Sequence, residues 1–67
     1  MRTLFAIYVP DHPASHWFAG WSATGEPVWV TSRYAAHIMD IDETWAERAM
    51  LRREVGDTLR TRLVATL

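Results

Sequence analysis

The sequence contains no cysteine, which excludes disulfides, thiol catalysis and cysteine-based zinc sites. It also contains no lysine, asparagine or glutamine, so all 7 basic residues are arginines. An arginine side chain is a planar fork that suits carboxylate, phosphate or aromatic partners. With 8 acidic residues the net charge is −1, so no field of one sign draws the chain to nucleic acid or to a membrane surface.

Long hydrophobic runs are also missing. The apolar run nearest the N-terminus spans residues 4–9 and is followed by Pro10 and Asp11. A secretory signal peptide needs about 7–15 apolar residues, and a membrane-spanning helix needs about 18 or more. We therefore expect no signal peptide, no membrane partner and a cytoplasmic location.

Large aromatic side chains are abundant, with 4 Trp, 2 Tyr and 2 Phe in 67 residues. The chain is 49% apolar and 22% charged, which is typical of a globular protein and predicts a single domain over residues 1–67. A domain of this size hides only about 60% of its unfolded surface. Either all the tryptophans are core, or some form an exposed aromatic patch of the kind that marks an interface. A homodimer would satisfy both interpretations.

The order of the elements predicts an α+β fold. The turn at residues 23–26 contains Gly25, which suits the positive φ of a hairpin loop. Asp40 and Glu43 have the spacing of a capping box, and Gly56 is placed to end a helix. The order β-β-β-α-α-β predicts a small four-stranded antiparallel or mixed sheet with helices packed on one face. The expected strands span residues 4–9, 16–22, 27–31 and 57–67, and the expected helices span residues 33–39 and 43–55.

Side-chain spacing predicts which residues face the core. Alternation in the first strand of the hairpin places Trp17 and Trp21 on one face. A four-residue loop would set Trp29 opposite Gly20, and a loop one residue shorter would set it opposite Trp21. The spacing allows both registers.

The last helix and the last strand also have predicted faces. Trp45 and Ala49, with Ile41 and Val55 in the same arc, are expected to pack on the sheet. In the last strand the leucines and Ala65 point inward. These inward residues are Leu59, Leu63, Ala65 and Leu67, and the outward ones are Arg60, Arg62 and Thr66.

The histidines and the serine before His16 do not form a convincing reactive site. His12 and His16 are four residues apart, but Pro13 between them makes a loop the expected structure, so convergence with His37 on a metal is not predicted. Ser15 and His16 with Asp11 or Asp40 lack the strand–turn–helix motif of a nucleophilic serine. We expect no metal, no cofactor and no enzymatic activity.

Aromatic and arginine side chains are the best candidates for contact with a partner, because Trp, Tyr and Arg are enriched at binding hot spots. The candidates are Trp17, Trp21, Trp29, Tyr34, Arg60 and Arg62. The same residues would make a stacking platform for single-stranded nucleic acid, although the net charge disfavours that alternative. The stripe formed by Glu43, Glu47 and Glu54 is ordinarily a solvated helix face, and it is the second candidate contact surface.

The hairpin resembles a pattern found in small proteins encoded by phages and prophages. The pattern reads aromatic-x-x-Gly-aromatic, then Gly-x-Pro-aliphatic-Trp, and it is met by residues 17–21 and 25–29. An alanine-rich turn over 33–39, the helix over 43–55 and a last strand complete the resemblance. Some such proteins are stoichiometric inhibitors of host defence, including anti-CRISPR proteins.

These observations predict a non-enzymatic protein–protein interaction module. The resemblance implies a phage-encoded inhibitor of a host defence complex in the host cytoplasm. The alternative is a single-stranded nucleic-acid-binding protein, and a structural, assembly or antitoxin-like role is the third prediction.

Overall fold

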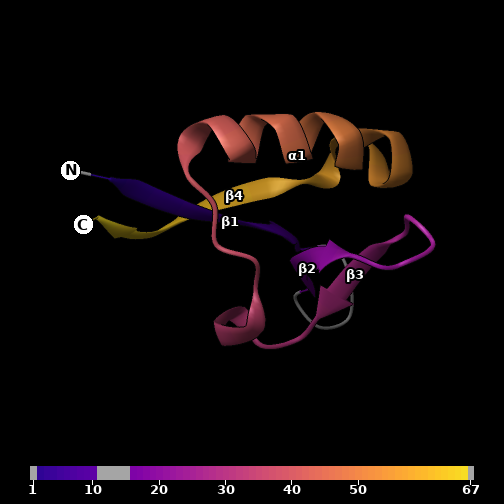
Figure 1. Cartoon of the computed structure of the whole chain (residues 1–67), viewed down its shortest axis with the longest axis horizontal. Helices are drawn as coiled ribbons and strands as arrows, with labels where there is room; N and C mark the ends of the chain where they lie inside the picture. Colours follow the sequence, from indigo (N-terminus) through magenta and orange to yellow (C-terminus); the bar gives the residue numbers. More distant parts are fainter. Residues whose placement is uncertain (1, 11–15, 67) are drawn as a thin grey trace.

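The computed structural model describes residues 2–10 and 16–66. The four strands form one antiparallel sheet in the order β3-β2-β1-β4, and α1 packs against one of its faces (Figure 1). The predicted α+β fold class is therefore confirmed. The elements are β1 (Thr3–Val9), β2 (His16–Trp21), β3 (Pro27–Val30), the 3-10 turn η1 (Arg33–Ala35), α1 (Ile41–Val55), the 3-10 turn η2 (Gly56–Thr58) and β4 (Arg60–Thr66).

Local signals set the hairpin turn and the ends of α1 as predicted. Gly25 has a φ of 83°, which a residue with a side chain rarely adopts. The Asp40 carboxylate accepts a hydrogen bond from the Glu43 backbone N–H at 2.9 Å, so Asp40 is the N-cap of α1. Gly56, with a φ of 74°, ends α1.

The predicted helix over residues 33–39 is wrong beyond its first turn. Only η1 is helical there, and the chain then becomes extended. Met39 and Phe5 exchange two backbone hydrogen bonds, of 2.7 and 2.9 Å. Within the described residues, β1 pairs with β2 at Tyr8–Trp17 and Val9–His16. The backbone groups of Phe5 on that side of β1 therefore need another partner. The extended segment supplies it, because unpaired buried backbone groups are costly.

The β2–β3 hairpin contains a register shift between Phe18 and Trp21. Gly20, with a φ of 119°, lies within the shift. Trp29 therefore pairs with Phe18, so both predicted partners of Trp29 are wrong. The shift also brings Trp21 to the same face as Phe18, where the two rings meet edge-on at 5.5 Å. Strict alternation would have placed them on opposite faces.

The sheet buries apolar side chains on both faces. On the α1 face, the core is joined by the half-buried Trp21, Trp29 and Val55. On the opposite face, Ala6, Trp17 and Ala36 are buried, with Tyr8 and Val30 packed beside them. In Figure 1, α1 and η1 lie on opposite sides of β1 and β4. The buried core on the α1 face comprises Ile7, Val9, Phe18, Met39, Leu51 and Leu59.

The predicted buried arc of α1 is wrong. Thr44 and Leu51 are the buried side chains of the helix, whereas Trp45 is 61% exposed. Ile41 and Ala49 are also exposed, and Val55 is half-buried.

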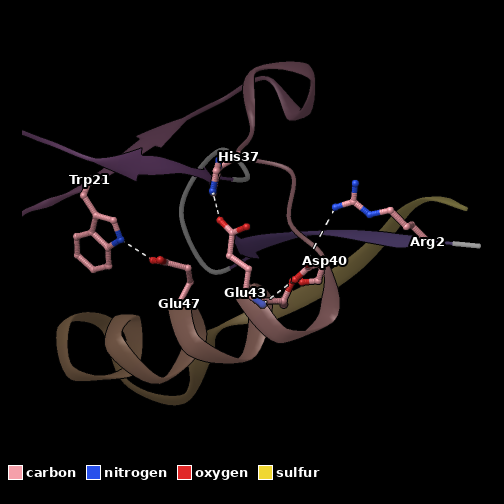
Figure 2. Close-up of polar contacts among 7 residues, drawn as sticks. Arg2, Trp21, His37, Asp40, Glu43 and Glu47 are labelled. Carbon is pink, nitrogen blue, oxygen red and sulfur yellow. Dashed lines mark hydrogen bonds and ion pairs between the residues drawn. The ribbon is translucent and has the colours of Figure 1, made fainter. Parts of the chain in front are cut away.

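The physical reason for this orientation is the burial of Leu51, which contributes about 1.5–3 kcal/mol, together with a hydrogen bond between the helix and the hairpin. The Glu47 carboxylate accepts a hydrogen bond from Trp21 Nε1 at 2.5 Å (Figure 2). Glu47 therefore points toward the hairpin, although the sequence predicts it on the outer stripe. Leu51, one turn further along, then enters the core and is 0% exposed.

β4 departs from its predicted pattern because it lies at the edge of the sheet. Leu59 is buried as predicted, and Arg60 and Arg62 are exposed. Leu63 is 56% exposed, since α1 packs on β1 and leaves this end of β4 uncovered. The pairing of β4 with β1 shifts between Leu63 and Ala65, so Val64 is an extra residue in β4. Leu67 lies outside the described residues.

Two neighbouring residues of α1 test the observed orientation of the helix. We expect Leu51→Ala to lower the free energy of unfolding by about 2–5 kcal/mol, because it leaves a cavity in the core. Met50→Ala is the control, since Met50 is 53% exposed and its loss should cost no more than about 0.5 kcal/mol. Urea unfolding followed by circular dichroism measures both. Equal losses would contradict this orientation.

Candidate binding groove on the open face of the sheet

A groove of about 480 Å³ lies on the sheet face opposite α1. We call it the open-face groove. Its floor comes from β1 and β2, one wall comes from the segment that links β3 to α1, and the other wall comes from β4. Its lining residues are Ala6 and Trp17 on the floor, Arg33, Tyr34 and Ile38 on the first wall, and Arg62, Leu63 and Val64 on the second.

The floor of the groove is apolar and held firmly. Trp17 is only 7% exposed, and its ring packs on that of Tyr8 with 4.8 Å between centroids and a tilt of 31°. Tyr8 and Trp17 are direct cross-strand partners, so β1 and β2 fix the pair. Ala6 is 1% exposed, and its small side chain leaves room above β1. A ligand side chain would therefore meet a preformed surface.

The first wall combines a cation with an aromatic ring. Ser32 accepts a hydrogen bond from the Tyr34 backbone N–H at 3.3 Å, which holds the start of η1. Tyr34 is 86% exposed, and the Arg33 guanidinium lies 5.2 Å from its ring centroid. Arg33 also donates a hydrogen bond to the Tyr34 hydroxyl at 3.4 Å. This bond and the positive charge of Arg33 lower the pKa of the Tyr34 phenol.

The second wall carries arginines from β4. Arg62 pairs with Ala6 and Arg60 pairs with Tyr8, so both arginines emerge on the open face. Arg60 folds back and donates hydrogen bonds to the carbonyls of Leu59 at 3.0 Å and Asp57 at 3.4 Å. Within residues 2–10 and 16–66, Arg62 makes no hydrogen bond or ion pair. Its guanidinium is therefore available to a ligand.

The open-face groove is positively charged, although the whole chain has a net charge of −1. Arg33 and Arg62 line it, and none of the described lining residues is acidic. The ion pairs of the described chain lie elsewhere, at Arg2–Asp40, His37–Glu43 and Arg52–Asp57. The groove can thus attract an anionic group over an apolar floor.

The structure divides the predicted contact residues between the two faces of the sheet. It brings Trp17, Tyr34 and Arg62 together in the groove and places Arg60 beside them. Trp21 and Trp29 belong to the α1 face, so the prediction that Trp17 and Trp21 share one face is wrong.

Sequence reasoning did not identify two residues of the first wall. Arg33 adjoins Tyr34 in the sequence, and this neighbouring pair was the available signal. Ile38 had no signal of its own, because its exposure on this face depends on the extended path of the chain toward Met39.

The acidic stripe of α1 is largely used inside the molecule (Figure 2). Glu43 lies 2.6 Å from His37 Nε2, and Glu47 accepts the hydrogen bond from Trp21. Glu54 is exposed. Glu43 is exposed although it pairs with His37, so the prediction of a solvated face is wrong only for Glu47, which is half-buried against the hairpin.

The residues considered for a metal site or a catalytic triad do not form a group in the described structure. His12, Asp11 and Ser15 lie outside the described residues. His37 pairs with Glu43. Within residues 2–10 and 16–66, no group of three or more His, Cys, Asp or Glu side chains is placed to hold a metal. The described helices also include none of the length and apolarity that a bilayer crossing requires.

Trp45 is an exposed aromatic residue that sequence reasoning placed in the core. The Arg48 guanidinium lies 5.8 Å from its ring centroid. A small hollow on the α1 face connects this part of the helix to the β4 edge. The hollow is lined by Phe5, Ile41, Thr44, Trp45, Arg48 and Thr61.

Comparison with known protein-family models, with curated proteins and with solved structures finds no match to this chain.

The contact between Arg33 and Tyr34 predicts a measurable titration. Arg33→Ala should raise the pKa of the Tyr34 phenol, because it removes both the hydrogen bond and the positive charge that favour the phenolate. Tyrosinate absorbance measured against pH detects the change, and a Tyr34→Phe variant identifies the signal. Arg53→Ala, on the exposed side of α1, is the control and should leave the titration unchanged. An unchanged midpoint in Arg33→Ala would contradict the contact.

Proposed function

We propose that this protein is a non-enzymatic interaction module that binds an acidic segment of a partner protein in the open-face groove. The observation that supports it is the composition of the groove. Two arginines line it, none of its described lining residues is acidic, and its floor is a buried tryptophan. Arg33 and Arg62 provide the charge, and Trp17 provides the floor.

The groove offers both parts of a binding hot spot. The unpaired guanidinium of Arg62 can donate two parallel hydrogen bonds to one carboxylate, an arrangement that fixes orientation as well as contributing energy. Trp17 and Ile38 present apolar surface beside it, where neighbouring side chains of the partner can be shielded from water. Because the floor is held by β-sheet pairing, little ordering cost falls on this chain when a ligand binds.

A protein partner is favoured over single-stranded nucleic acid by the distribution of charge. Nucleic acid requires a positive track along several phosphates. Here Arg60 is bonded to backbone carbonyls, and three other arginines lie on α1 rather than along the groove. Those three are Arg48, Arg52 and Arg53. A short acidic segment carries few negative charges, so the guanidiniums of Arg33 and Arg62 are enough to bind it.

The biological role that we propose is stoichiometric inhibition of a host defence complex in the host cytoplasm. The resemblance to phage proteins supports this role, and such an inhibitor needs a binding surface and no catalytic group. A structural, assembly or antitoxin-like role and a homodimer remain predictions from the sequence.

A titration with defined probes tests the binding function. The first probe is a pool of short peptides containing glutamate and valine in equal numbers and in every order. The second is a short oligodeoxythymidine. We expect the peptide pool to bind saturably and to shift the NMR signal of the Trp17 indole. Arg62→Glu should weaken this binding by about tenfold or more, since a hydrogen bond to a charged group contributes about 1.5–3 kcal/mol.

The matched control is Arg53→Glu, which makes the same charge change on the exposed side of α1. It should change peptide binding by no more than about twofold, because exposed charges at a distance are screened. An equal loss in both variants would show non-specific attraction and contradict the proposal. Saturable binding of the oligonucleotide at Trp17 would favour the nucleic-acid alternative instead.

A further inference from the structure

We infer that the partner segment binds as an extended strand added to the free edge of β4, and that it alternates acidic and apolar side chains. This inference rests on the proposed function for the acidity of the partner segment. It places the backbone of that segment on the outer side of β4, where an acidic side chain can reach Arg62 in the wall of the groove. It joins two features that the sheet brings together: the arginine wall of the open-face groove, and the hollow beneath Trp45 on the other face.

β4 is the better of the two sheet edges for strand addition. It spans Arg60–Thr66 and contains no proline. The other edge, β3, spans only Pro27–Val30 and begins with a proline, which cannot donate a backbone hydrogen bond. β4 pairs with β1 along one side, and no strand within residues 2–10 and 16–66 pairs with its other side, which a new strand can therefore join.

The two faces of the β4 edge offer different chemistry. Arg60 and Arg62 emerge on the open face. Thr61 lies on the α1 face, where it lines the hollow with Trp45 and Ile41. Side chains of an added strand alternate between the faces, and each would lie about 4.5–5.5 Å from its neighbour in β4. An acidic residue would then meet the free guanidinium of Arg62, and the apolar residues on either side of it would face Trp45.

Charge complementarity selects an acidic partner strand over a second copy of this chain. Pairing of β4 with its own copy would gather Arg60 and Arg62 of both copies on one face, and like charges across strands are destabilising. None of the described lining residues of the groove is acidic and able to compensate. The extra residue at Val64 interrupts the regular ladder, so the segment that pairs most regularly is 60–63.

Peptides that differ only in residue order test this mode of binding. One probe alternates glutamate and valine, and the other has the same composition with the glutamates in one block. We expect the alternating peptide to bind this protein about tenfold or more tightly than the block peptide. Two further versions of the alternating peptide carry N-methyl groups on every second backbone amide, either on the amides that would face β4 or on those that would face away. We expect methylation of the amides facing β4 to weaken binding by about tenfold or more, and methylation of the others to weaken it less.

Two further readouts locate the bound strand. Hydrogen exchange of β4 amides should slow when the alternating peptide binds, because these groups gain partners. Trp45→Ala should weaken the binding of the alternating peptide more than the binding of the block peptide. Met50→Ala is the matched control, since Met50 is 53% exposed on the same helix but does not line the hollow.

The outcomes separate this inference from the proposed function. Strand addition is overturned, and the acidic groove stands, if both peptides bind equally, N-methylation has no effect and Arg62→Glu still weakens binding by about tenfold or more. If neither peptide binds, the proposed function itself fails. If β4 amides are protected without peptide and the protein has the mass of a dimer, a second copy occupies the edge and the inference is overturned.

Discussion

The register shift around Gly20 is the constraint on which the two faces of this sheet depend. Because the shift lies between Phe18 and Trp21, both rings reach the α1 face, where Trp29 meets Phe18 at a centroid distance of 6.0 Å. Trp17, which precedes the shift, is left on the other face and becomes the floor of the groove. A regular hairpin would place Trp17 and Trp21 on one side and remove this division.

Features set by local chemistry could be predicted from the sequence. The strands were found to within a few residues, since β-branched and aromatic runs ended by proline or glycine have few other solutions. Asp40 and Gly56 mark the two ends of α1 because each satisfies backbone groups next to it. Of the groove, Trp17, Tyr34 and Arg62 were recognised by residue type alone.

Features set by distant contacts could not be predicted in the same way. The apolar residues of α1 are spread over several sides of the helix. Periodicity alone therefore does not show whether the side with Trp45 or the side with Leu51 faces the core. The observed arc packs Leu51 into a core built from distant strands and brings Glu47 to Trp21, which is 26 residues away in the sequence. The alternation of residues along a strand likewise does not reveal a register shift. Gly20 is the only signal of the shift in the sequence, and a glycine can also occur in a regular strand.

The location of the groove follows from how little chain is available to cover the sheet. α1 is the only α-helix in the described chain; it packs on β1 and is joined to β2 by the hydrogen bond between Glu47 and Trp21. The opposite face receives only Ala36 and its neighbours, which seal Trp17 but stop short of β4. Leu63 and Val64 of β4 are therefore left exposed. Because the fold needs no ion pair at this edge, Arg62 can stay unpaired without a stability cost. The arginine that β4 offers to a partner is therefore compatible with the apolar core, because the core does not depend on that arginine.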